Sequence, residues 1–174
     1  MRNKKIFKIV LSALFIATAY VLPFLTGQIP DIGNMLCPMH IPVILCGFVC
    51  GWQYGLAAGT ISPLLRSLTL SMPALFPRAV CMAVELAVYG VAAGLMYKTF
   101  PKKKIYIYLS LIISMILGRI AWGIAMFFCM EFLGKSVGFS YFIAESIVNA
   151  LPGIVIQIIF IPVAVMLIEK RKMK

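Results

Sequence analysis

The sequence has few acidic residues and almost no histidine. Of its 174 residues, five are Asp or Glu and one is His, and charged residues of both signs make up 12% of the chain. General acid–base catalysis and metal binding both depend on carboxylates and imidazoles brought together in space. We therefore predict no catalytic residue and no metal site.

Motifs of nucleotide and hydrolytic chemistry are also missing. The complete phosphate loop G-x-x-x-x-G-K-[ST] is absent: Gly134-Lys135-Ser136 matches its end, but Cys129 stands where the first glycine belongs. No His-Glu zinc motif and no G-x-S-x-G elbow occur. We predict that the chain is not an enzyme and holds no cofactor of its own.

The cysteines and the absence of repeats exclude further classes. The five cysteines are scattered and odd in number, and no nearby His or acid completes a metal set with Cys46 and Cys50. They are expected to be buried apolar residues. No internal repeat and no low-complexity segment is visible, which argues against an inverted-repeat transporter.

What the chain does contain is apolar residues, at 63% with a mean hydropathy of +1.03. A soluble domain is near half apolar, so we predict an integral membrane protein. Runs of about 20 apolar residues predict six transmembrane helices in one compact all-α bundle, a single domain of residues 1–174. The approximate spans are 6–25, 35–51, 54–70, 76–97, 105–132 and 142–168.

The net charge of +11 is concentrated beside the apolar segments. Twelve of the 16 Lys and Arg residues lie in residues 2–8, in Lys98 with residues 102–104, and in residues 170–174. With six spans, the positive-inside rule places these clusters and both termini in the cytoplasm of a bacterial plasma membrane, against anionic lipid. This pattern argues against a nucleic-acid partner. The first cluster resembles the start of a signal peptide, but the apolar run after it is a full span long, so we expect it to be retained.

Polar and ionisable residues inside spans are costly, and they usually face the protein interior and serve a function. They are His40, Arg66, Arg78, Glu85, Arg119, Glu145, Asn149 and Gln157. Most lie in the predicted outer half, which favours a binding pocket that opens outward. Because guanidinium groups bind carboxylates bidentately, the arginines and the histidine suit an anionic ligand.

Structural roles for the same residues stay open. Glu85 and Arg119 lie at similar depth and would neutralise each other. Arg78 would reach the outer headgroups. His40 stands between Pro38 and Pro42, where it would satisfy backbone groups that the prolines free.

Small residues give a second signal. Ala13 and Ala17 form a small-xxx-small pair in the first span, and Gly55, Ala58 and Gly59 form a similar face on the third. Such faces allow helices to pack closely. The first face either packs inside this chain or docks onto a partner subunit.

The central third of the chain resembles a known family. The stretch 34–43 reads Asn-Met-Leu-Cys-Pro-Met-His-Ile-Pro-Val, Ser71-Met72-Pro73 and Pro77 follow further on, and the stretch closes with Glu85-Leu-Ala-Val-Tyr-Gly at 85–90. Residues 34–94 look like the substrate-binding S component of energy-coupling factor (ECF) importers, in the group that includes pantothenate-type vitamin carriers. Ser71 departs from the glycine expected before Met-Pro.

The resemblance implies a six-helix cylinder that captures a small water-soluble vitamin or precursor near the outer face. It also implies gating by the 1/2 loop, with Asp31 and Asn34, and by the 3/4 loop, with Met72 and Pro73. Ala13 and Ala17 would dock onto a transmembrane coupling (T) subunit, and two cytoplasmic ATPases would use the ATP that drives uptake.

The anionic-ligand argument places pantothenate first among the substrates. A queuosine precursor, a pyridoxine-type vitamin and a corrinoid stay open. Two other classes are a small membrane enzyme that uses Glu85, Glu145 or His40, and an assembly protein that binds no small molecule. Product formation without partners would indicate the enzyme, and a co-purified metabolite would count against the assembly protein.

Overall fold

The computed structural model describes residues 2–26, 37–101, 103–134 and 150–172, and their regular structure is entirely helical. The elements are α1 (Arg2–Val21), the 3-10 turn η1 (Leu22–Thr26), α3 (His40–Cys50), α4 (Trp52–Leu70), the π-type turn η2 (Leu75–Ala79), α5 (Val80–Thr99), α6 (Lys104–Phe132) and α8 (Leu151–Lys172). The expectation of an all-α protein is confirmed for this part of the chain.

Within the described residues, four helical segments are long and apolar enough to cross a membrane: Asn3–Phe24, Leu75–Thr99, Lys104–Phe132 and Leu151–Ile168. Side chains on their outer surfaces are large and apolar, as on α6 at Ile116, Ile120 and Ile124. Water would not favour such a surface, whereas lipid tails would. The expectation of a multi-pass membrane protein is therefore supported, while the full count of six crossings stays a prediction.

The helix α3 is shorter than the predicted second span. It has 11 residues, about 16 Å at a rise of ~1.5 Å per residue, which is roughly half of the hydrocarbon core. Pro38 disfavours a helical conformation at Cys37, whose φ is 45°. Pro42 lies in the first turn of α3, where its missing N–H costs nothing. The helix therefore begins inside the bundle, at His40.

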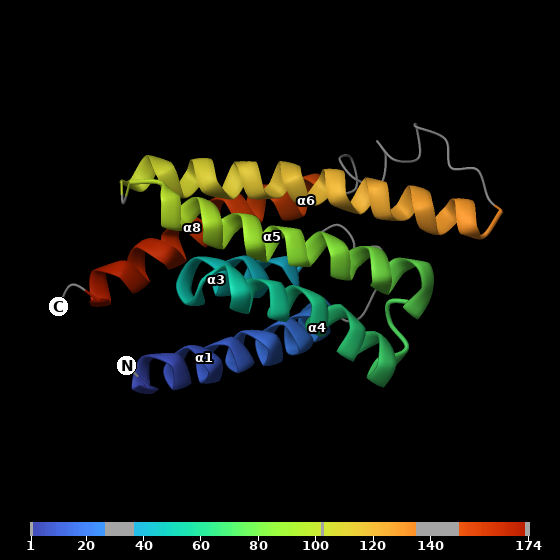
Figure 1. The fold of residues 1–174 in the computed structure, drawn as a ribbon, viewed down its shortest axis with the longest axis horizontal. Coiled ribbons are helices and arrows are strands. Elements are labelled where there is room, and N and C mark those ends of the chain that lie inside the picture. The colour runs from blue at the N-terminus through green and yellow to red at the C-terminus, as the bar shows by residue number, and fades with distance from the viewer. Residues whose placement is uncertain (1, 27–36, 102, 135–149, 173–174) are drawn as a thin grey trace.

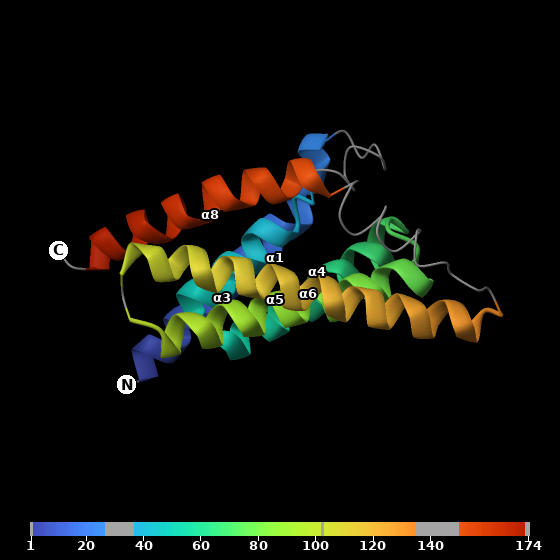
Figure 2. The ribbon, with the colours of Figure 1, turned by 90° about the horizontal axis from the view of Figure 1, so that it is seen from above.

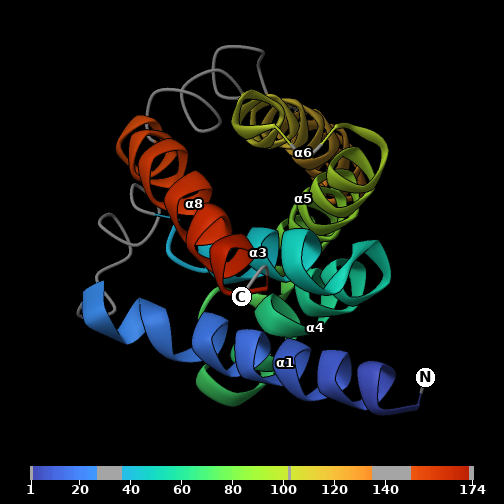
Figure 3. The ribbon, with the colours of Figure 1, turned by 90° about the vertical axis from the view of Figure 1, so that its left-hand side faces the viewer.

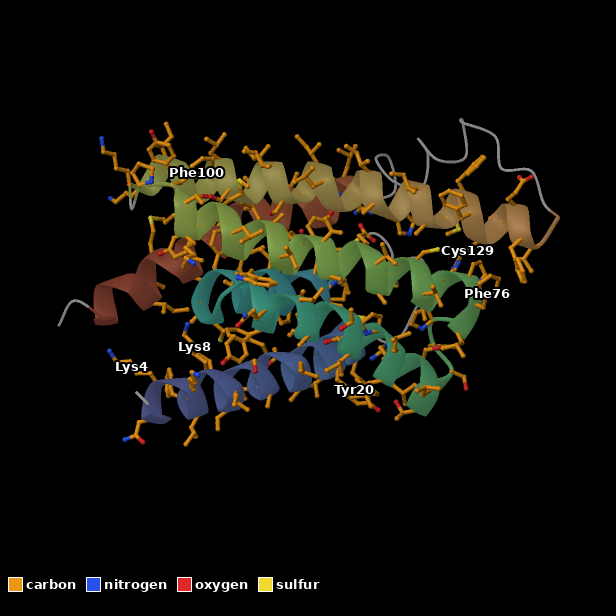
Figure 4. The ribbon with its side chains drawn as sticks, in the orientation of Figure 1. Lys4, Lys8, Tyr20, Phe76, Phe100 and Cys129 are labelled. Atoms are coloured by element: carbon orange, nitrogen blue, oxygen red, sulfur yellow. The ribbon has the colours of Figure 1, made fainter. Side chains whose placement is uncertain are left out.

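The positively charged segments gather at one end of the molecule. Figure 1 shows the start of α1, the end of α8 and the α5–α6 connection at the same end. Lys4 and Lys8 extend from this end in Figure 4, whereas Phe76 and Cys129 lie toward the other. This is the arrangement that the charge clusters predict for a protein with both termini on one side of the membrane.

Glycines bring α3, α4 and α5 into direct backbone contact. A Cβ added to Gly55 would lie 2.5 Å from the carbonyl oxygen of Gly90, and one added to Gly94 would lie 2.5 Å from the backbone nitrogen of Trp52. Gly47 and Gly59 have equally close backbone neighbours. We call the five glycines, at positions 47, 55, 59, 90 and 94, the glycine seam. The small face predicted on the third span thus packs inside this chain.

The helices α3, α5, α6 and α8 surround one interior. α3 contacts α5, α5 contacts α6, α6 contacts α8, and α8 contacts α3. The end-on view of Figure 3 and the view from above in Figure 2 show α8 on the opposite side of this group from α5. α1 packs outside it, against α3 and α4. His40 on α3, Glu85 on α5, Arg119 on α6 and Gln157 on α8 come from these four helices.

Candidate functional site

A buried ion pair between α5 and α6 lies at the centre of the site. Nη1 of Arg119 lies 3.1 Å from Oε1 of Glu85, whose side chain is only 2% exposed. Each charge would be very costly alone in this environment, so each depends on the other. The mutual neutralisation considered from the sequence is what the structure shows.

His40 approaches the same carboxylate from the start of α3. Its Nε2 lies 3.5 Å from Oε1 of Glu85, and its side chain is 3% exposed. The imidazole ring also meets the Tyr89 ring edge-on, with 5.3 Å between the ring centroids. Tyr89 follows Glu85 by one turn of α5, so both side chains lie on the same face of that helix. Three helices thus converge on one carboxylate.

Cys37 joins the cluster just before α3 begins. Nη2 of Arg119 donates a weak hydrogen bond to Sγ of Cys37 over 3.8 Å. The guanidinium therefore spans from the carboxylate of α5 to the thiol beside α3. We call Cys37, His40, Glu85, Tyr89 and Arg119 the polar cluster.

The polar cluster leaves several buried atoms without a hydrogen bond. Among the described residues of the cluster, these atoms are both ring nitrogens of His40, Oε1 of Glu85 and Nε of Arg119. Outside the cluster, Oε1 of Gln157 on α8 also lacks a hydrogen bond. Oε1 of Glu85 lies close to Arg119 and His40 without the alignment of a hydrogen bond, while the Glu85 carboxyl also has a side-chain hydrogen bond with Tyr89. Buried polar groups are nearly always satisfied, so this concentration of unsatisfied atoms indicates a place for a bound polar molecule.

Three of the predicted binding residues, His40, Glu85 and Arg119, are brought together in this way. Arg66 lies elsewhere, near the end of α4. Its Nη1 donates a hydrogen bond to the backbone oxygen of Tyr20 over 2.9 Å, and its guanidinium lies 5.1 Å from the centre of the Phe24 ring. These contacts tie α4 to α1 and η1. A ligand contact for Arg66 stays a prediction.

The other predicted positions divide into exposed residues and residues outside the described chain. Arg78 is exposed on η2, Met72 is exposed, and Pro73 is partly buried beside it. Ser71, at the position where glycine is expected, has a φ of 55°, which is the conformation that glycine adopts easily. Asp31, Asn34, Glu145 and Asn149 lie outside the described residues.

Ala13 and Ala17 both lie exposed on α1, whereas Ser12 and Ala19 face inward and are buried. The exposed pair is flanked by large exposed apolar side chains, Val10 and Leu14. Packing inside this chain therefore does not account for the small-xxx-small face. It is available to lipid or to another protein.

Sequence reasoning assigned no binding role to Tyr89, Cys37 or Gln157. The spacing of four residues between Glu85 and Tyr89 was a usable signal, since it places both on one helix face. Gln157 was visible as a polar residue in an apolar span, which indicates an inward orientation, but nothing in the sequence showed which other polar residues share its surroundings. Cys37 belongs to the cluster only because the chain bends before α3.

Comparison with known proteins gives one clear result. Residues 7–165 match the model of the family described as ECF transporter, substrate-specific component. Because the match covers most of the chain, the protein belongs to this family. No curated protein and no solved structure matches the chain. The family consists of transporter components and is not a family of enzymes.

Proposed function

We propose that this member of the ECF transporter substrate-specific component family captures a small water-soluble vitamin or vitamin precursor at the outer face of the bacterial plasma membrane. Family membership supports a substrate-binding subunit of an ECF importer. The observation that carries the proposal further is the polar cluster, in which buried polar atoms from α3, α5 and α6 lack hydrogen bonds. A bound ligand would satisfy them.

The proposed orientation has six crossings with both termini in the cytoplasm. It is supported by the exposed lysines at the start of α1 and around the α5–α6 connection, which lie at one end of the molecule. Basic residues favour the cytoplasmic side, where the leaflet is anionic. The opposite end, with η2 and the far end of α6, would then receive the substrate.

Pantothenate is the first candidate substrate. Beside its carboxylate it carries hydroxyl and amide groups, whose oxygens can accept hydrogen bonds from a guanidinium and whose O–H and N–H groups can donate to the Glu85 carboxylate. A queuosine precursor, a pyridoxine-type vitamin and a corrinoid are the alternatives within the same transporter class. Identification of the bound ligand would decide among these four substrates.

The decisive experiment is to purify the full chain gently in detergent and to identify any retained small molecule by mass spectrometry. Thermal unfolding of the ligand-free protein is then measured against a vitamin panel. We expect one vitamin to co-purify and to raise the melting temperature, because a ligand that binds only the folded state stabilises it. Absence of both effects would contradict the proposal.

We place the docking surface for the T subunit, which works with two cytoplasmic ATPases, on the exposed face of α1. Ala13 and Ala17 leave a shallow surface between larger apolar side chains, and small residues allow another helix to approach closely. The substitutions Ala13→Trp and Ala17→Trp should abolish uptake in cells and leave ligand affinity unchanged. Ile116→Trp, on the exposed side of α6, is the matched control and should preserve both. Normal uptake in both alanine variants would remove the docking assignment.

A further inference from the structure

Unsatisfied polar atoms come from all four helices that surround the interior, and not only from the polar cluster. α3 contributes His40, α5 contributes Glu85, α6 contributes Arg119, and α8 contributes Gln157, whose side chain is 1% exposed. These helices contact one another in a closed cycle. The unsatisfied oxygen of Gln157 therefore belongs to the same interior, although it lies far from the others in sequence.

The residues also lie at similar depth. Glu85 is 14 residues from the end of α5 at Thr99, Arg119 is 15 residues from the start of α6 at Lys104, and Gln157 is 15 residues from the end of α8 at Lys172. At ~1.5 Å per residue, each is roughly 21–23 Å from the basic end. Figure 2 shows these three helix ends at the same end of the molecule.

Among the residues that the structure describes, the charges on the inner faces of these four helices cancel. Arg119 and Glu85 form an ion pair, and with the imidazole counted as neutral the formal net charge of the four side chains is zero. Arg66 has its contacts at the α1–α4 interface, and Arg78 is exposed on η2. A buried carboxylate here would be an unpaired negative charge in an apolar environment, which is strongly unfavourable.

The unsatisfied atoms also require a particular hydrogen-bonding pattern. Nε–H of Arg119 can only donate a hydrogen bond, and the side-chain oxygens of Glu85 and Gln157 can only accept one. In a neutral imidazole one ring nitrogen donates and the other accepts. The part of the ligand that lies against these atoms must therefore both accept and donate. A hydroxyl or a primary amide does this, whereas an ionised carboxylate has no donor.

We infer that the inner faces of α3, α5, α6 and α8 bind an uncharged hydroxyl- or amide-bearing end of the substrate, and that Gln157 takes part in selecting it. The inference rests on the proposed function and makes it more specific. Any carboxylate on the substrate, as on pantothenate, then points away from Arg119 and toward the end of the bundle that carries η2. The protein recognises the substrate by its neutral polar end.

The test compares matched ligands that differ only in the charged group. Pantothenate is paired with panthenol, nicotinate with nicotinamide, and biotin with biotin amide, and the affinity of each for the purified full chain is measured by calorimetry. For the scaffold that binds, we expect the neutral member to bind within about threefold of the acid. A neutral member at least tenfold weaker would overturn the inference and leave the proposed function intact.

Gln157→Leu tests the contribution of α8. We expect the affinity for the bound scaffold to fall about tenfold, as for loss of one buried hydrogen bond. We expect the melting temperature of the ligand-free variant to rise by about 2–4 °C, because a buried unsatisfied oxygen is removed. Ser67→Ala is the matched control: Ser67 also has an unsatisfied buried oxygen, but it lies on α4, outside the four helices. It should raise the melting temperature and leave affinity unchanged.

The remaining outcomes are also decisive. Unchanged affinity in Gln157→Leu would exclude Gln157 from the site, and a lower melting temperature without ligand would show that its oxygen already has a partner. If no compound in the panel binds and none co-purifies, the proposed function fails and this inference fails with it.

Discussion

The glycine seam and the polar cluster lie on different faces of α5 and are built in opposite ways. On α5, Gly90 and Gly94 bring backbones together, whereas Glu85 and Tyr89 present polar atoms to α3 and α6. The seam has no room for one additional carbon atom. The cluster has buried atoms that lack hydrogen bonds. Close packing on one face supplies stability, whereas the other face leaves buried polar atoms that we propose a ligand satisfies.

The largest effect should follow from filling the seam. In Gly90→Leu, the new side chain would meet the backbone of Gly55, which cannot move without separating α4 from α5. Overpacking costs about 1–3 kcal/mol where side chains adjust, and more where backbone is the obstacle. We expect no folded, monodisperse protein by size-exclusion chromatography.

Val84→Leu is the control for this change, because it places a leucine on the exposed side of the same helix. It should behave like the unmodified protein. If Gly90→Leu also folded normally, the contrast between a rigid seam and an adaptable cluster would be wrong.

Breaking the ion pair of the cluster should have the next largest effect. Glu85→Ala leaves Arg119 buried without its partner, which costs about 3–5 kcal/mol. The double variant Glu85→Leu with Arg119→Met removes both charges and should recover most of that stability, because apolar residues of similar size replace the pair. Ligand binding should be lost in both variants.

Thermal unfolding in detergent measures the stability of each variant, and calorimetry measures its ligand affinity. A double variant that is stable but does not bind would show that the ion pair is kept for function. A double variant as unstable as Glu85→Ala would instead assign the pair a structural role.

A smaller effect is expected at Arg66, which belongs to neither region. Arg66→Ala removes a charge-assisted hydrogen bond to Tyr20, worth about 1.5–3 kcal/mol, and a contact with the Phe24 ring. We expect a lower melting temperature. Arg78→Ala, at an exposed position near the same end, is the control and should change stability by less than about 0.5 kcal/mol. Weaker ligand binding by Arg66→Ala at unchanged stability would place Arg66 in the binding site, as the sequence predicted.

The smallest effect should occur at Gly118, a glycine of α6 outside the seam that packs against Tyr89 of the polar cluster. A Cβ at Gly118 would lie 2.9 Å from the Tyr89 ring, a side chain that can shift, rather than from backbone. Gly118→Ala should therefore fold with a loss of about 1 kcal/mol or less. Because Tyr89 contacts His40, we expect ligand affinity to change more than stability, by severalfold in calorimetry. An unchanged affinity would show that the position of Tyr89 does not matter for binding.

The apolar composition determined the class of this protein, and the basic clusters determined which ends of the helices lie together. Both follow from local physics, since apolar length suits a bilayer and lysine next to a span avoids its interior. Only the tertiary structure decided which polar residues meet. Glu85, Arg119 and His40 come from three helices and converge on one carboxylate, while Arg66, which the same sequence argument grouped with them, turns toward α1.

Which polar residues meet depends on how each helix is rotated about its axis, and the packing of all the helices sets that rotation. In this chain the glycines position α3, α4 and α5, and so fix the direction of Glu85 and Tyr89. The sequence alone revealed that buried polar groups exist. Their partners, and the surroundings of Gln157, depend on contacts between residues far apart in the chain.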